Sequence, residues 1–445
     1  MTRMSSGCED DVVGGKDKMS RSTTFSGQVV STFATQIVML GLSVIGSAIV
    51  ARWLGPDGKG TLTLVLLVPG MLSVLLNGGI SMANVYFLAR RRVELASASR
   101  NSVAFAFVAT IVGFGIIAGA VWSGWLETLA PRVPESLVII AMVGLPISLL
   151  SMYINSILQA LQRIPTINLA NLVSSAMTVI GTTLLVVWMG FGLIGAVAAT
   201  LVSGVAGLIV MGRAVREVGG KFGPSWNLSA MGSTLAFGLK GHIGQMLQFF
   251  NYRLDAFLVN YFLGSGGVGI YSVSVAVGEM LWYLPNAVGF VLFPRVASST
   301  REEMDVFTPQ VLLMTLGLIS LGAIALAVIG KSLIELVYSS AFSDAYGPMV
   351  ALLPGIVFLG GAKVVCTDIV GRGYPAYNSI NTGCALVITV ILDIILIPRY
   401  GVTGAAIAST IAYTTIFFTA IVFYALVRRS GRREGLQFPA PSRRP

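Results

Sequence analysis

Charged side chains are scarce in this sequence. Only 11% of its 445 residues are Asp, Glu, Lys or Arg, whereas a typical soluble domain contains about a quarter. A soluble globule of this length needs more charge to cover its surface, so the composition excludes an ordinary soluble protein. Basic residues outnumber acidic ones, 29 to 19, but no soluble face remains on which they could form a nucleic-acid-binding patch. We expect no nucleic-acid partner.

Residues that bind metals or nucleotides are also few. The one histidine, His242, excludes a multi-histidine metal site, and the three cysteines have neither metal-ligand nor disulfide-framework spacing. No Walker motif is present. Two G-x-G-x-x-G matches, at 190–195 and 264–269, lie between apolar runs instead of after a strand. The sequence therefore predicts neither a metal site nor nucleotide hydrolysis.

Long apolar runs dominate what remains. The hydrophobic fraction is 55%, the mean hydropathy is +0.83, and runs of about 20 residues suffice to cross about 30 Å of hydrocarbon. In lipid such runs must be helices, because every backbone polar group needs an internal partner. We predict an all-α polytopic membrane protein with twelve spans, at 27–51, 60–88, 102–123, 136–160, 166–188, 191–213, 236–262, 269–294, 309–330, 348–370, 376–397 and 402–427.

The sequence also repeats itself at a spacing of 209 residues. Residues 54–60 (LGPDGKG) correspond to 263–269 (LGSGGVG), and 190–196 (GFGLIGA) correspond to 399–405 (RYGVTGA). Two matches in one register predict two homologous lobes of six helices. An even number of spans in each lobe gives both the same orientation, so we predict a parallel internal repeat of the kind found in transporters.

The lobes and tails follow from these spans. We predict a cytoplasmic N-terminal tail at 1–24, an N-lobe at 25–213, a cytoplasmic linker at 214–235, a C-lobe at 236–429 and a basic C-terminal tail at 430–445. Residues 226–235 are expected to form a short interfacial helix in the linker. With both termini in the cytoplasm, 21 of the 29 Lys and Arg residues fall in inner segments, five in outer loops and three within spans. The positive-inside rule therefore favours this orientation in a cell (inner or plasma) membrane.

Polar side chains inside the spans mark the candidate site, because ionisable groups are costly at membrane depth. The seventh span is richest, with a broad polar face that we expect to line a cavity. The predicted substrate-binding cations are Lys240, Arg253 and Lys363; the predicted ion-coupling groups or charge partners are Asp255, Glu279 and Asp368; and the predicted polar lining is His242, Gln245, Gln248, Asn251, Gln36, Asn77 and Asn84.

Several of these residues have alternative interpretations. Arg253 or Lys363 could form structural ion pairs with nearby carboxylates, and Lys240 could extend to the cytoplasmic interface. His242 could be a satisfied polar residue, and Asp393 could reach the outer interface. A cationic cavity suits an anionic headgroup such as a diphosphate or a uronic acid. A carboxylate suits a coupling H⁺ or Na⁺, and we expect no other cofactor.

A set of short motifs resembles one family. In order they are 51–60 (ARWLGPDGKG), 253–255 (RLD), 262–264 (FLG), 268–272 (VGIYS), 292–295 (LFPR), 371–373 (GRG) and 398–408 (PRYGVTGAAIA). Their order and spacing resemble the polysaccharide-type flippases of the multidrug/oligosaccharidyl-lipid/polysaccharide exporter superfamily, over about residues 25–425. Few charges lie within the spans of the first half. In this the sequence departs from the family pattern, and it gives little support for a substrate site shared by both lobes.

The resemblance implies a non-enzymatic transporter that works by alternating access. Its substrate would be an oligosaccharide on an undecaprenyl diphosphate carrier, moved from the inner to the outer leaflet for cell-surface or exopolysaccharide synthesis. Membrane lipids, and polysaccharide polymerase and assembly proteins, are the other implied partners. Two alternatives remain at this point. An ion-coupled exporter of small organic cations would need more cavity carboxylates, and a membrane polymerase or ligase would need a large catalytic outer loop.

Overall fold

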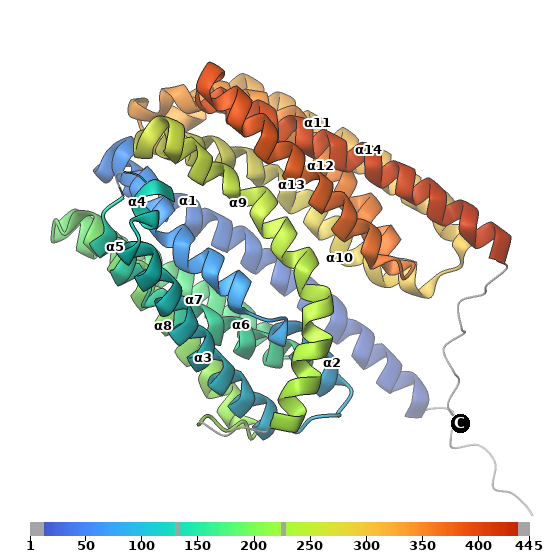
Figure 1. Cartoon of the computed structure of the whole chain (residues 1–445). Helices are drawn as coiled ribbons and strands as arrows, with labels where there is room; N and C mark the ends of the chain where they lie inside the picture. Colours follow the sequence, from blue (N-terminus) through green and yellow to red (C-terminus); the bar gives the residue numbers. More distant parts are fainter. Residues whose placement is uncertain (1–12, 130, 132, 224–227, 435–445) are drawn as a thin grey trace, which may run out of the picture.

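The computed structural model describes residues 13–129, 131, 133–223 and 228–434, and the regular elements within them are all helical (Figure 1). The first half of the chain forms α1 (Val13–Leu76), α2 (Ile80–Ala89), α3 (Leu95–Trp122), α4 (Trp125–Leu129), α5 (Glu135–Ala141), α6 (Gly144–Ala160), α7 (Ile164–Thr182), a π-helical turn η1 (Thr183–Trp188) and α8 (Gly192–Glu217). The second half forms α9 (Leu228–Glu279), η2 (Met280–Trp282), α10 (Tyr283–Ser298), α11 (Arg301–Tyr338), η3 (Ser340–Ala345), α12 (Tyr346–Gly371), α13 (Pro375–Tyr400) and α14 (Val402–Glu434).

Two of these helices are hairpins that reverse direction at a glycine. α1 is broken at Gly55 (φ 68°, ψ −173°) and α9 at Gly264 (φ 78°, ψ −177°), a backbone conformation that is essentially restricted to glycine. Across the first turn the Lys59 amino group donates to Ser47 Oγ at 2.9 Å. Twelve residues of straight helix would separate these groups by about 18 Å. The two glycines occupy equivalent positions of the 209-residue repeat.

Ten helices of the described part are long and apolar enough to cross a membrane. Two of the ten are the hairpin-containing segments, so together they accommodate the twelve predicted spans. The boundaries differ in two places. α1 already begins within the predicted tail 1–24, and residues 228–235 belong to α9 instead of forming a separate interfacial helix. Residues 224–227, and with them Trp226, lie outside the described residues.

The outer surface of the bundle is apolar, as a lipid-facing surface must be. On α11 the side chains of Leu313, Leu321, Val328 and Leu336 are 66–76% exposed. In water such a surface would form an extended hydrophobic patch, whereas in lipid it meets a solvent of its own polarity. Together with the absence of strands among the described residues, this confirms the prediction of an all-α polytopic membrane protein.

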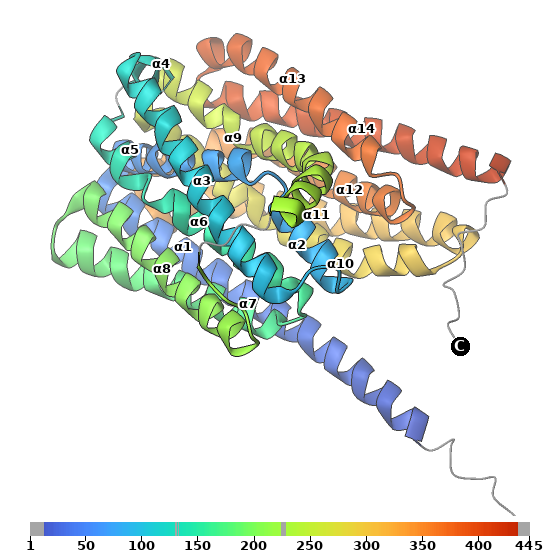
Figure 2. The same ribbon diagram turned by 60° about the horizontal axis from the view of Figure 1, so that its bottom comes forward.

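The two halves of the chain lie side by side, and α9 joins them. Figures 1 and 2 show α1–α8 (blue to green) on one side and α10–α14 (yellow to red) on the other. α9 packs against α1 and α2 of the first half and against α12 and α13 of the second. The polar face of this helix, predicted from the sequence, therefore lies between the two halves.

The two hairpin turns contact each other through glycines. A Cβ atom added to Gly60 would overlap the Ser265 carbonyl, and one added to Gly269 would overlap the Pro56 carbonyl. Ser265 Oγ also donates to Asp57 Oδ1 at 3.0 Å. Pro56 and Ser265, like Gly60 and Gly269, are 209 residues apart (265 minus 56, and 269 minus 60). Equivalent positions of the repeat thus meet at one end of the molecule, where the small residues permit close helix approach.

Candidate substrate cavities and ion site

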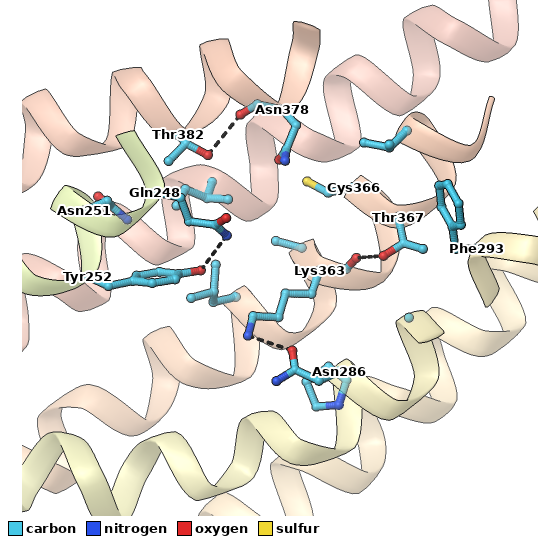
Figure 3. Close-up of a pocket in the computed structure, with 16 residues that line it drawn as sticks. Gln248, Asn251, Tyr252, Asn286, Phe293, Lys363, Cys366, Thr367, Asn378 and Thr382 are labelled. Carbon is cyan, nitrogen blue, oxygen red and sulfur yellow. Dashed lines mark hydrogen bonds between the residues drawn. The ribbon is translucent and has the colours of Figure 1, made fainter. Parts of the chain in front are cut away.

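The second half of the chain contains a polar cavity of 420 Å³ (Figure 3). α9 contributes Gln248, Asn251 and Tyr252, and α10 contributes Asn286. The remaining polar lining comes from Lys363, Cys366 and Thr367 on α12 and from Asn378 and Thr382 on α13. Amide and hydroxyl groups both donate and accept hydrogen bonds. A ligand rich in hydroxyl groups therefore fits this lining.

Lys363 is the charged residue of this cavity lining. Its amino group donates to Asn286 Oδ1 at 3.0 Å and lies 4.3 Å from the ring centroid of Trp282. Neither partner carries a negative charge, so the ammonium is held in place without being neutralised by them. A cation in this position can bind a phosphate or carboxylate of a ligand. The predicted role of Lys363 is therefore compatible with its geometry.

A second polar cavity, of 680 Å³, lies in the first half of the chain. It is lined by α2, α6, α7 and α8 and by the turn between α1 and α2, and α9 contributes Gln245. The predicted residue Asn77 also lines it. Gln245 faces this cavity whereas Gln248, one turn further along α9, faces the other. The polar face of α9 is thus divided between two cavities, one in each half.

Two buried carboxylates lie near each other, one on α9 and one on α13. Thr389 Oγ1 donates to Asn251 Oδ1 at 3.3 Å, which joins the two helices. One turn further on in both helices lie Asp255, 4% exposed, and Asp393, fully buried. The interpretation that Asp393 reaches the outer interface is therefore wrong. Their positions bring the carboxylates close enough for their charges to interact.

The two carboxylates differ in their hydrogen bonds. Asp255 accepts from the Tyr271 hydroxyl and, at 2.8 Å, from the Ala256 backbone N–H. Neither carboxylate oxygen of Asp393 has a hydrogen-bond partner among the described residues. The Tyr271 hydroxyl also lies 3.4 Å from Ser409 Oγ, which adds an oxygen from α14. Two nearby buried carboxylates disfavour each other's ionised form, so this group of oxygens is suited to a proton or a small cation.

Arg253 is a charge partner of Glu279. Their side chains approach to 3.5 Å across the hairpin of α9 and are 43% and 20% exposed. Arg253 therefore has the geometry of a structural ion pair, which was the alternative to a substrate-binding role. Glu279 also lines a 310 Å³ cavity next to α1. A partly exposed pair of this kind can exchange its partner for a charged ligand at small cost.

Asp368 lies at the end of α12 in a separate charge network. It binds the Arg372 guanidinium one turn further on and accepts from the Thr308 hydroxyl of α11. Arg372 also lies 3.0 Å from Asp305 Oδ1, and Asp305 in turn lies 3.1 Å from Arg428. Asp368 is thus a charge partner of Arg372 and not of one of the predicted cavity cations. The network ties α11, α12 and α14 together.

Replacing Arg372 with methionine is expected to destabilise the protein by about 3–5 kcal/mol, because it leaves Asp368 buried without its cation. Thermal unfolding of the purified protein in detergent measures this loss. Glu303→Gln provides the control, since the Arg295–Glu303 pair is 47% and 50% exposed and such pairs contribute about 1 kcal/mol or less. Equal effects of the two substitutions would contradict a structural role for the network.

The remaining predicted residues have varied surroundings. His242 is buried, with Nε2 3.4 Å from the Leu75 carbonyl and Nδ1 without a partner in the described part of the chain. Asn84 donates to Ser102 and Ser156 at 2.9 and 3.3 Å, so its amide is used in helix packing. Gln36 lines neither large cavity. The side chain of Lys240 lies outside those that the structure describes.

Several residues of the cavities and the ion site were not predicted as site residues. Asn155 and Gln159 are four residues apart on α6, and Thr389 and Asp393 are four apart on α13. This spacing places each pair on one helix face and was a usable signal in the sequence. Asn286, by contrast, is an isolated polar residue in α10, and only packing places it beside Lys363.

The fold is that of a known class of membrane transporter. The solved structure of the lipid II flippase MurJ in an inward closed conformation matches with a TM-score of 0.74, covering 91% of this chain and 90% of that one at 14% identity. An inward-facing multidrug resistance MATE family transporter of the MOP superfamily matches with a TM-score of 0.71, covering 92% of this chain and all of that one at 16% identity. At these identities the likeness shows the fold, and it confirms the predicted superfamily architecture.

Sequence comparison identifies the family within this class. A family model described as polysaccharide biosynthesis protein matches residues 27–300, and the chain belongs to this family. A putative O-antigen transporter of Shigella flexneri is 23% identical over 81% of this chain and 88% of its own length. The probable low-salt glycan biosynthesis flippase Agl15 of Haloferax volcanii is 25% identical over 37% of this chain and 36% of its own length.

Three of the curated relatives match over only part of their length. The chain spans about a third of the length of three curated relatives, 34–36% in each case, and one of these three is the probable flippase AglR of Haloferax volcanii. The relatives with a functional name are called flippases or transporters, in agreement with the prediction that this protein is not an enzyme.

Proposed function

We propose that this protein moves lipid-linked oligosaccharide from the inner to the outer leaflet of a cell membrane for surface or exopolysaccharide synthesis. The observation that carries the proposal is the pair of polar cavities, of 420 and 680 Å³, on the two sides of α9 inside an otherwise apolar bundle. Amides and hydroxyls suit a glycan, and Lys363 suits the diphosphate of an undecaprenyl diphosphate carrier. Membership of the family supports the same function.

Alternating access is the mechanism that we propose for this movement. The hairpin turns at Gly55 and Gly264 contact each other at one end of the molecule, and the positive-inside bias favours that end as the outer one. Opening there and closing at the opposite end would expose the cavities to the outer leaflet. Both termini would then be cytoplasmic, and polymerase and assembly proteins would receive the glycan outside.

A coupling ion supplies the driving force in this proposal. The Asp255–Asp393 pair replaces Glu279 and Asp368 as the best candidate for binding H⁺ or Na⁺, because Glu279 and Asp368 already have arginine partners. A cation that moves through the full membrane potential gains about 2.3 kcal/mol per 100 mV. Binding at this pair would neutralise the site and change which packing of α9 against α13 is favoured.

The test is the sidedness of the lipid-linked oligosaccharide in the native host after depletion of this protein. Completed units are expected to accumulate on the cytoplasmic face, and surface polysaccharide is expected to be lost. Complementation with Lys363→Gln should restore transport at least about tenfold less well than wild type, because a charged hydrogen bond to the diphosphate contributes about 1.5–3 kcal/mol.

Lys331→Gln is the matched control, since this lysine is exposed at the far end of α11 and lines neither cavity. Normal sidedness and normal polysaccharide, in a host with no second flippase, would contradict the proposal. Export of a small organic cation, the other function expected of this superfamily, would then be the next activity to assay.

A further inference from the structure

The cavity of the first half has a lining without charge. Five carboxamides face it: Asn77, Asn155, Gln159, Asn171 and Gln245. Three methionines, Met82, Met152 and Met211, supply apolar and polarisable surface between them. No Asp, Glu, Lys, Arg or His is among the described residues that line this cavity. At 680 Å³ it is also the larger of the two cavities, so it offers space for several sugar rings.

Most of these carboxamides are free to bind a ligand. The side chains of Asn155, Gln159, Asn171 and Gln245 make no hydrogen bond to other described residues, whereas Asn77 is held by Ser81 at 3.2 Å. Each free carboxamide offers two donors and one acceptor oxygen, which match sugar hydroxyls that both donate and accept. A buried carboxylate or sulfate would instead need a cation, because partial charges compensate a full charge poorly.

Arg90 contacts a residue of this lining but is not itself part of it. Arg90, at the end of α2, donates to the Tyr86 hydroxyl at 2.8 Å, and its guanidinium lies 4.4 Å from the Tyr86 ring centroid. Tyr86 itself lines the cavity, whereas Arg90 does not. Among the described residues that line the two cavities, the cation is Lys363, on the other side of α9.

We infer that the transported glycan is neutral: its diphosphate lies at Lys363, and its sugars, without carboxylate, sulfate or phosphate groups, lie against the carboxamides of the first half. This deepens the proposed function and rests on it. The diphosphate and the sugars are assigned to different cavities because of the charges. Both linings offer hydrogen bonds, but among their described residues only Lys363 supplies a cation.

The test uses the purified full-length protein in liposomes with two probes. One is a polyprenyl diphosphate carrying N-acetylglucosamine, and the other carries the same sugar with its C6 oxidised to a carboxylate. Access of a membrane-impermeant diphosphatase to each probe measures its rate of transfer across the bilayer. The neutral probe is expected to cross at least about tenfold faster, because an unpaired buried charge costs several kcal/mol and each tenfold equals about 1.4 kcal/mol.

A lysine introduced into the cavity should change this selectivity. Gln159→Lys is expected to bring the transfer rate of the acidic probe to within about threefold of that of the neutral probe, since it supplies the missing cation. Asn171→Lys gives a second version of the same test if the first variant does not fold. Ser123→Lys, at an exposed position outside both cavities, controls for added positive charge.

The outcomes separate this inference from the proposed function. Equal wild-type rates for the two probes, or a faster acidic probe, would overturn the neutral-glycan inference while transport itself stood. Transfer of neither probe by wild type would overturn both. Lys363→Gln should slow both probes by the same factor because both carry the diphosphate, and a selective effect on the acidic probe would contradict the assignment of charge to the two cavities.

Discussion

Replacing Asp393 with asparagine is expected to abolish ion-driven transport while the protein still folds. The carboxylate is fully buried, and both its oxygens lack partners among the described residues. Asparagine keeps the shape but removes the charge that would bind a proton or Na⁺. Loss of the gradient-driven component should be at least about hundredfold, because removing a buried ionic interaction costs about 3–5 kcal/mol. Transport in liposomes with and without an imposed H⁺ or Na⁺ gradient measures it.

Folding provides the internal check on this substitution. A buried carboxylate without hydrogen bonds is costly, so Asp393→Asn is expected to unfold at the same temperature as wild type or a higher one. Asp344→Asn, at an exposed position in η3, is the matched control and should leave both transport and stability unchanged. A variant at Asp393 that retains normal gradient dependence would exclude the Asp255–Asp393 pair as the coupling site.

Replacing Gly60 with leucine is expected to hold the two hairpin turns apart. The new Cβ would overlap the Ser265 carbonyl, and because the obstacle is backbone, no rotamer change can relieve it. Overpacking of this kind costs about 1–3 kcal/mol, which would shift the balance between closed and open states about 5- to 150-fold. We therefore expect transport to be lost.

A thiol probe at the same end of the molecule measures the separation directly. Asn260 is buried and donates to the Pro131 carbonyl at 3.2 Å. A cysteine at this position, in a cysteine-free background, should react faster with an external reagent when Gly60 is leucine. Gly269→Ala should act in the same direction, because a Cβ there meets the Pro56 carbonyl. An unchanged labelling rate in both variants would show that this contact does not control access.

Gly115→Leu is the matched control for these substitutions. The G-x-x-x-G spacing of Gly115 and Gly119 predicts a helix-packing contact, but a Cβ at either position meets nothing within 4 Å. The prediction is therefore wrong for this pair, because both glycines face the outside of α3. A leucine there should enter lipid and leave transport unchanged.

The candidate site could be predicted in part, and the reason differs between residues. The polar face of α9 was visible because Gln245, Gln248 and Asn251 recur at helical spacing. Its division between two cavities was not, since this depends on where α9 crosses the two halves. The pairing of Asp255 with Asp393 was also hidden. It requires the register between α9 and α13, which their contacts set and which no local pattern encodes.

The sequence by itself determined the features that depend on local chemistry. Apolar runs of membrane length must form helices because lipid cannot satisfy backbone hydrogen bonds, and glycines at equivalent positions of the repeat permit the turns at Gly55 and Gly264. The tertiary structure decided which polar groups meet: Arg253 with Glu279 and Asp368 with Arg372, whereas Asp393 has no hydrogen-bond partner among the described residues. The physical reason is that electrostatic pairing depends on distances of a few ångströms between helices, and packing of the whole bundle sets those distances.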